Sequence, residues 1–81
     1  MNEERLKFIG RRSELELRKR DLSLRIERLV NTMRDELDPV KPVSELRSDA
    51  IVSTALELAE ACDRLRDASA DLKKIREILG R

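Results

Sequence analysis

The sequence predicts an all-α fold, an antiparallel hairpin of two long amphipathic helices, because of three features. Its 81 residues are 43% charged and 40% hydrophobic with one aromatic side chain, a composition typical of long helices and coiled coils. Two glycines and two prolines leave few places for turns. Leucines recur at seven-residue spacing in both halves. We therefore expect one domain over residues 1–81, with helices over about 3–37 and 44–79 and a turn over 38–43.

The first helix carries apolar residues on two nearly opposite sides, and only Gly10 interrupts its helical composition. The ridge expected to face the second helix consists of Phe8, Leu15, Leu22, Ile26, Leu29 and Met33. The opposite stripe consists of Leu6, Leu17 and Leu24, in a heptad frame completed by Gly10, Ser13 and Asn31. One partner helix cannot cover both sides, so the second stripe predicts a further contact.

The turn is predicted by Pro39 and Pro42, because each proline prevents an upstream helix from continuing. Ser44 is the expected N-cap of the second helix, with Glu45 in its first turn, where the helix dipole favours negative charge. Gly80 is the expected stop at the far end.

The second helix presents a leucine ridge bordered by small residues, which allow close approach of a neighbouring helix. The ridge consists of Ile51, Leu58, Leu65, Leu72 and Leu79, and its borders include Thr54, Ala61, Ala68 and Cys62. In a hairpin centred on Val40, Leu22 would face Leu58 and Leu15 would face Leu65. We expect Cys62 to be a small residue of the core.

Self-association is the expected source of further stability, since a domain this small rarely suffices alone. One cysteine and no histidine exclude an internal disulfide and a zinc-type ligand set. The face predicted to meet another subunit or a protein partner consists of Leu6, Leu17, Leu24, Val52 and Leu56. These leftover stripes predict a homodimer forming a four-helix bundle, or a complex with helices of another protein.

Charge is unevenly distributed although the net charge is only +1. Residues 5–28 hold nine Lys/Arg against four Asp/Glu, and residues 35–71 hold four against ten. The candidate nucleic-acid contacts on the basic first helix are Arg11, Arg12, Arg18, Lys19 and Arg25. Acidic residues are interleaved with these cations, and Phe8, the one aromatic side chain, is assigned to the seam and is not available for stacking on bases. A nucleic-acid regulator is therefore the alternative to a protein-binding function.

Other function classes find little support. No histidine, tyrosine or glycine-rich loop is available, so we expect neither an enzyme nor a cofactor. The acidic stripe of Glu60, Asp63, Asp67 and Asp71 is flanked by arginines, and we expect no metal there. The absence of a membrane-length apolar run or a secretory signal predicts a cytoplasmic protein without membrane contacts. The leading expectation is a non-enzymatic helical interaction protein.

Overall fold

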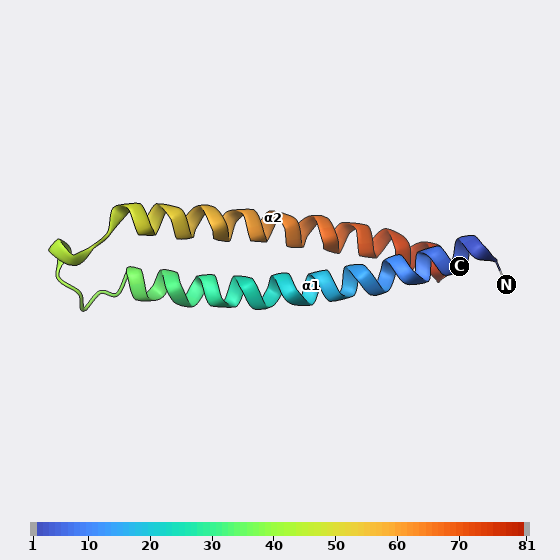
Figure 1. Ribbon diagram of the computed structural model, residues 1–81, viewed down its shortest axis with the longest axis horizontal. Helices are drawn as coiled ribbons and strands as arrows, with labels where there is room; N and C mark the ends of the chain where they lie inside the picture. The colour runs from blue at the N-terminus through green and yellow to red at the C-terminus, as the bar shows by residue number, and fades with distance from the viewer. Residues whose placement is uncertain (1, 81) are drawn as a thin grey trace.

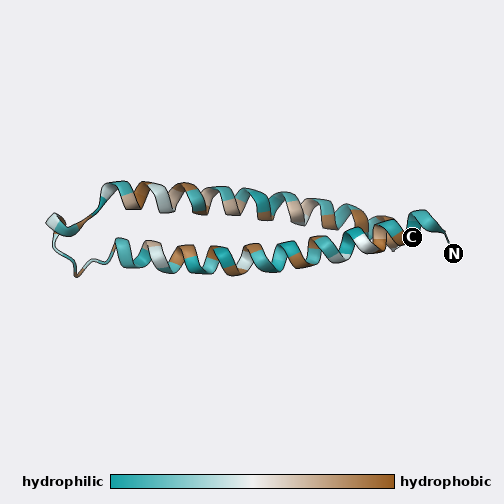
Figure 2. Cartoon of the chain, in the orientation of Figure 1, coloured by the Kyte–Doolittle hydropathy of each residue, from teal (hydrophilic) through white to brown (hydrophobic). Residues whose placement is uncertain are grey.

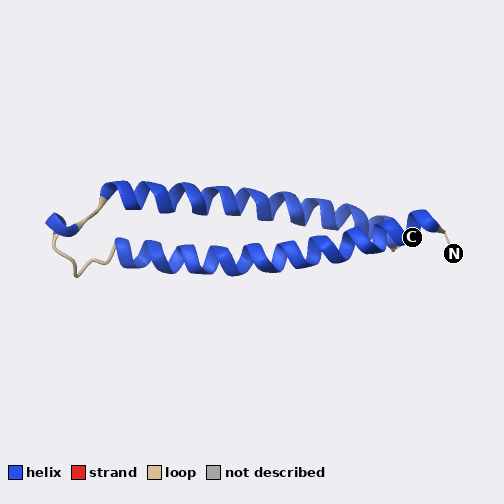
Figure 3. Ribbon diagram, in the orientation of Figure 1, coloured by secondary structure: helices blue, strands red, loops and turns tan. Residues whose placement is uncertain are grey.

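The computed structural model describes residues 2–80, which form two long helices packed against each other as a hairpin. Helix α1 spans Glu3–Glu36 and helix α2 spans Ser48–Leu79, with one turn of 3-10 helix, η1, at Val43–Glu45 between them. The molecule measures 64 × 16 × 15 Å. The two helices run antiparallel, and the described residues contain no strand (Figures 1 and 3). The predicted all-helical hairpin is confirmed.

Helix α1 begins with a side-chain cap and continues without a break for 34 residues. The side-chain oxygen of Asn2 accepts a hydrogen bond from the backbone N–H of Glu4 at 3.0 Å, which satisfies a donor that the helix leaves free. Glu3 and Glu4 place negative charge in the first turn, where the helix dipole favours it. The helix passes through Gly10, and a Cβ added there would meet no neighbour within 4 Å.

The connection between the helices is longer than the sequence predicted. The Asp38 carboxylate accepts a hydrogen bond from the N–H of Val40 at 2.9 Å, and the N–H of Glu45 donates to the carbonyl of Pro42 at 2.9 Å. Leu46 and Arg47 are then extended, so helix cannot propagate from η1. The expected N-cap at Ser44 is therefore wrong, because α2 begins only at Ser48. Gly80 follows the last residue of α2, as expected.

The core is a single seam along the facing sides of α1 and α2. Leu15 and Leu72 are 1% exposed and are the largest fully buried side chains. Other residues with little exposure are Leu22, Thr54, Ala61, Ala68, Ile75 and Leu79. Phe8 and Ile9 pack against the end of this core. Figure 2 shows hydrophobic positions recurring along the whole length of both helices, between polar ones.

The register of the two helices differs from the expected one. The Thr54 hydroxyl donates to the Glu36 carboxylate at 2.6 Å, and Met33 and Leu58 line one hollow. In a hairpin centred on Val40, Glu36 would face Ser44, which is ten residues before its observed partner Thr54. The observed pairs are thus displaced along α2 by about ten residues, nearly three helical turns. The expected pairings of Leu22 with Leu58 and of Leu15 with Leu65 are therefore wrong.

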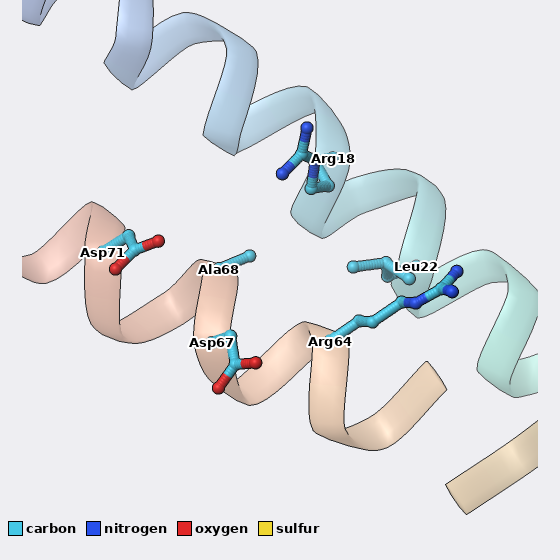
Figure 4. Close-up of a pocket in the computed structure, with 6 residues that line it drawn as sticks. All are labelled: Arg18, Leu22, Arg64, Asp67, Ala68 and Asp71. Atoms are coloured by element: carbon cyan, nitrogen blue, oxygen red, sulfur yellow. The ribbon is translucent and has the colours of Figure 1, made fainter. Parts of the chain in front are cut away.

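The length of the connection accounts for the displacement. The non-helical residues before Ser48 move the centre of the hairpin toward the C-terminus. Leu22 and Ala68 then lie on facing sides of the seam, where both line one open hollow (Figure 4). The N-terminal turns of α1 consequently extend past the end of α2 (Figure 1), and the Arg5 guanidinium donates to the Leu79 carbonyl at 3.4 Å.

Candidate functional site

The side of α1 that faces away from α2 carries three exposed leucines among charged residues. Leu6, Leu17 and Leu24 are all exposed, Leu17 to 57%. The Ser13 hydroxyl donates to the Ile9 carbonyl at 3.2 Å within the same helix, so this serine needs no partner of its own. We call Leu6, Gly10, Ser13, Leu17 and Leu24 the α1 outer stripe. The three leucines lie outside the hairpin seam and leave apolar area in water.

Helix α2 carries exposed apolar side chains near the turn and exposed carboxylates farther along. Val52 and Leu56 are exposed near the turn, Leu56 to 66%. Farther along, the exposed carboxylates are those of Glu60, Asp63, Asp67 and Asp71. Within residues 2–80, Glu60 pairs with Arg64, and Asp63 pairs with Arg66 at 3.5 Å. The outward side of α2 thus offers a shorter apolar contact than that of α1.

The connection forms an apolar tip that the sequence analysis missed. Val40 is 86% exposed and Val43 is 83% exposed, and Leu37 and Leu46 are also exposed. An open hollow of about 350 Å³ adjoins them, lined by Val30, Met33, Arg34, Leu37, Pro39 and Leu58. Residues 37–46 hold two leucines and two valines beside the two prolines, and this is the signal in the sequence for the tip.

A second open hollow lies along the seam near the middle of the hairpin. Arg18 and Leu22 of α1 line it together with Arg64, Asp67, Ala68 and Asp71 of α2 (Figure 4). The Arg64 side chain extends toward α1 in this view and also pairs with Glu60. The side chains that line this hollow carry both positive and negative charges, so it has no strong preference for an anion or a cation.

The five candidate nucleic-acid contacts do not share one face. Arg12 and Lys19 are half-buried beside the seam, whereas Arg11, Arg18 and Arg25 are exposed and seven residues apart, about 10 Å along the helix. Arg11 pairs with Glu14 at 3.2 Å, and Arg12 pairs with Glu16 at 3.9 Å. Within residues 2–80, Arg18, Lys19 and Arg25 form no ion pair.

The single thiol lies outside the seam. Cys62 is exposed, so its expected place in the core is wrong. The leucine ridge of α2 has small residues on both borders, and α1 packs on the border with Thr54, Ala61 and Ala68. Because Cys62 belongs to the other border, its sulfur is left accessible to solvent.

The described residues offer surfaces and open hollows as candidate sites. Among residues 2–80, no three of the Cys, Asp and Glu side chains come together as a metal-binding group. Neither α1 nor α2 is apolar enough over its length to cross a membrane. No family model, curated protein or solved structure matches this chain.

Proposed function

We propose that this chain is a non-enzymatic helical interaction protein, which self-associates into a four-helix bundle and binds a protein partner through its remaining exposed faces. The observation that carries the proposal is the α1 outer stripe, three leucines exposed on the side of the helix opposite the seam. Burial of such a stripe is the usual source of affinity between helices in water.

The exposed area of the hairpin supports the proposal quantitatively. The chain exposes 6459 Å², whereas a compact protein of its 9.4 kDa mass exposes about 5,000 Å². Its Cα radius of gyration is 18.3 Å, against about 12 Å for a compact domain of this length. The excess area of about 1,400 Å² exceeds the roughly 800 Å² that each partner buries in a standard interface.

Two apolar surfaces remain for a protein partner if the α1 outer stripe is used for self-association. They are the outward residues Val52 and Leu56 of α2 and the tip around Val40 and Val43. Both lie near the turn end of the hairpin, whereas the α1 outer stripe extends toward the opposite end (Figure 1). The surfaces for a protein partner therefore do not overlap the dimer interface, and each subunit of the dimer can bind a partner near its turn.

Sedimentation equilibrium with circular dichroism on the same sample tests the proposal. We expect a strongly helical species whose mass is twice that of the chain at micromolar concentration and falls toward one chain on dilution. A reducing agent must be present, because Cys62 is exposed and a disulfide between two chains would give a covalent dimer. A fully helical monomer at every concentration would contradict self-association.

A second candidate function is binding of RNA or DNA through α1. The observation that favours it is the row of Arg11, Arg18 and Arg25, of which Arg18 and Arg25 form no ion pair within residues 2–80. Binding through phosphate contacts weakens steeply with salt. The test is a titration with RNA and DNA at low and moderate salt.

The matched variants for that titration change two charges each. Arg18→Gln with Arg25→Gln removes the row on α1, and Lys73→Gln with Lys74→Gln removes two exposed cations of α2. Nucleic-acid binding predicts loss only in the first pair. No binding by the unchanged chain at low salt would exclude this candidate.

A further inference from the structure

The α1 outer stripe combines large and small residues in the manner of a helix-packing surface. Gly10, Ser13 and Arg20 lie between Leu6, Leu17 and Leu24 on the same side of the helix. A glycine inside a helix is destabilising relative to alanine, and the hairpin gains no packing from Gly10, since a Cβ there would meet nothing within 4 Å. A second helix at this face could use the space, because small residues permit close approach of helix axes.

The charges beside the α1 outer stripe are compatible with a second α1 in antiparallel orientation. The outward side of α1 is bordered on one edge by Lys7, Glu14, Asp21 and Arg28 and on the other by Arg20 and Glu27. If two α1 helices run antiparallel with Leu6 beside Leu24, each Lys7 lies near an Asp21 of opposite charge, and the two Glu14 side chains meet near the two-fold axis.

We infer that the α1 outer stripe is the self-association surface, covered by the α1 of a second copy in antiparallel orientation. The inference rests on the self-association of the proposed function and specifies its face and partner. The two-fold axis passes near residue 15, so that Leu6 meets Leu24 of the partner subunit and Leu17 meets Ser13 of the partner subunit. The two α1 helices form the central pair of the four helices.

The dimensions of the hairpin are adequate for this contact. Residues 3–27 of α1 overlap the same residues of the second copy over about 36 Å. The hairpin exposes more area than a compact chain by about 1,400 Å², so a dimer burying roughly 800 Å² per copy still leaves area at the tip and on α2.

Two matched aspartate variants test which face self-associates. Leu17→Asp and Leu56→Asp make the same change at residues that are 57% and 66% exposed, one on each helix. We expect Leu17→Asp to raise the dimer dissociation constant about tenfold or more and Leu56→Asp to leave it within about twofold, because a charge is costly only where it is desolvated. Dichroism shows that each variant remains helical.

Disulfide trapping tests the orientation in a Cys62→Ser background. Ser13→Cys combined with Leu17→Cys should give a linked dimer under mild oxidation, whereas Ser13→Cys alone should give little. In the antiparallel arrangement the two residues at position 13 are offset by about 6 Å along the helix axis. The separation between the two helices adds to this offset, so the two sulfurs are beyond disulfide reach. Efficient linking of Ser13→Cys alone indicates parallel helices and overturns the inference.

The outcomes separate the inference from the proposed function. If the unchanged chain is a dimer and Leu56→Asp dissociates it while Leu17→Asp does not, self-association stands and the assigned face is wrong. If the unchanged chain is a monomer at all concentrations, both the self-association and its assignment to α1 fail. Dissociation by Leu17→Asp alone, with cross-links between positions 13 and 17, establishes the inference.

Discussion

The Thr54 hydroxyl donates a hydrogen bond of 2.6 Å to the Glu36 carboxylate, and thereby joins the last residue of α1 to the second turn of α2. Thr54 is buried in the seam and Glu36 is half-buried. Within the described chain, the second carboxylate oxygen of Glu36 is buried and has no hydrogen-bond partner. A polar pair at the end of an apolar seam favours one register, because any slip of the helices would leave both groups unsatisfied.

Replacement of Thr54 by Val should destabilise the hairpin by about 1–2 kcal/mol, since it preserves shape and leaves the Glu36 carboxylate without its donor. Thr54→Val combined with Glu36→Leu should recover most of this loss, because an apolar pair needs no hydrogen bond. Urea unfolding followed by dichroism measures both variants. An unchanged midpoint for Thr54→Val would mean that the bond contributes nothing to stability.

The two faces of α1 can be compared by the same substitution two residues apart. Leu15→Ala removes a side chain that is 1% exposed and should cost about 2–4 kcal/mol of unfolding free energy. Leu17→Ala changes an exposed side chain and should alter the stability of the monomer by less than about 0.5 kcal/mol. Urea unfolding at a concentration low enough to give monomers compares them. Equal losses in the two variants would contradict the assignment of the seam.

The existence of both helices could be predicted from the sequence, but their register could not. Leucine spacing and two prolines are local signals, and they correctly indicate α1, the turn and most of α2. A heptad repeats, however, so displacing one helix along the other leaves the seam apolar, and Leu22 finds an acceptable neighbour in more than one register. The choice depends on the length of the connection, and only the structure shows that Leu22 and Ala68 line one hollow.

Similar ambiguity explains the misplaced thiol and the missed tip. Cys62 and Ala61 border the same leucine ridge on opposite sides, and sequence spacing does not say which border a partner helix covers. For Val40 and Val43, the prolines correctly indicate a turn, yet nothing local says that no other element covers the valines. The exposure of Leu6, Leu17 and Leu24 was indicated because their spacing conflicts with the main ridge on the same helix.

Gly10→Ala should stabilise the isolated hairpin by about 0.5–1 kcal/mol, because alanine favours helix and its methyl group meets no atom within 4 Å. Thermal unfolding at low protein concentration measures this gain. At high concentration the gain should be smaller if another α1 packs closely on Gly10. A gain that is equal at both concentrations would count against close packing there.

The Cys62 thiol should react nearly as fast in the folded chain as in the unfolded chain, because Cys62 is exposed. Reaction with a chromogenic disulfide reagent in buffer and in denaturant measures the two rates. The Ala61→Cys change in a Cys62→Ser background provides a buried control, since Ala61 is in the seam. Strong protection of Cys62 would indicate that another chain covers this side of α2.

The register itself can be tested with two cysteine pairs that share one position, in a Cys62→Ser background. Leu22→Cys with Ala68→Cys should form an intramolecular disulfide under mild oxidation, because both residues line one hollow across the seam. Leu22→Cys with Leu58→Cys should not, because Leu58 lies about 15 Å farther along α2 than Ala68. Gel mobility without reductant and mass spectrometry of proteolytic fragments identify the linked pair. Efficient linking of positions 22 and 58 would restore the hairpin centred on Val40, in which leucines face leucines.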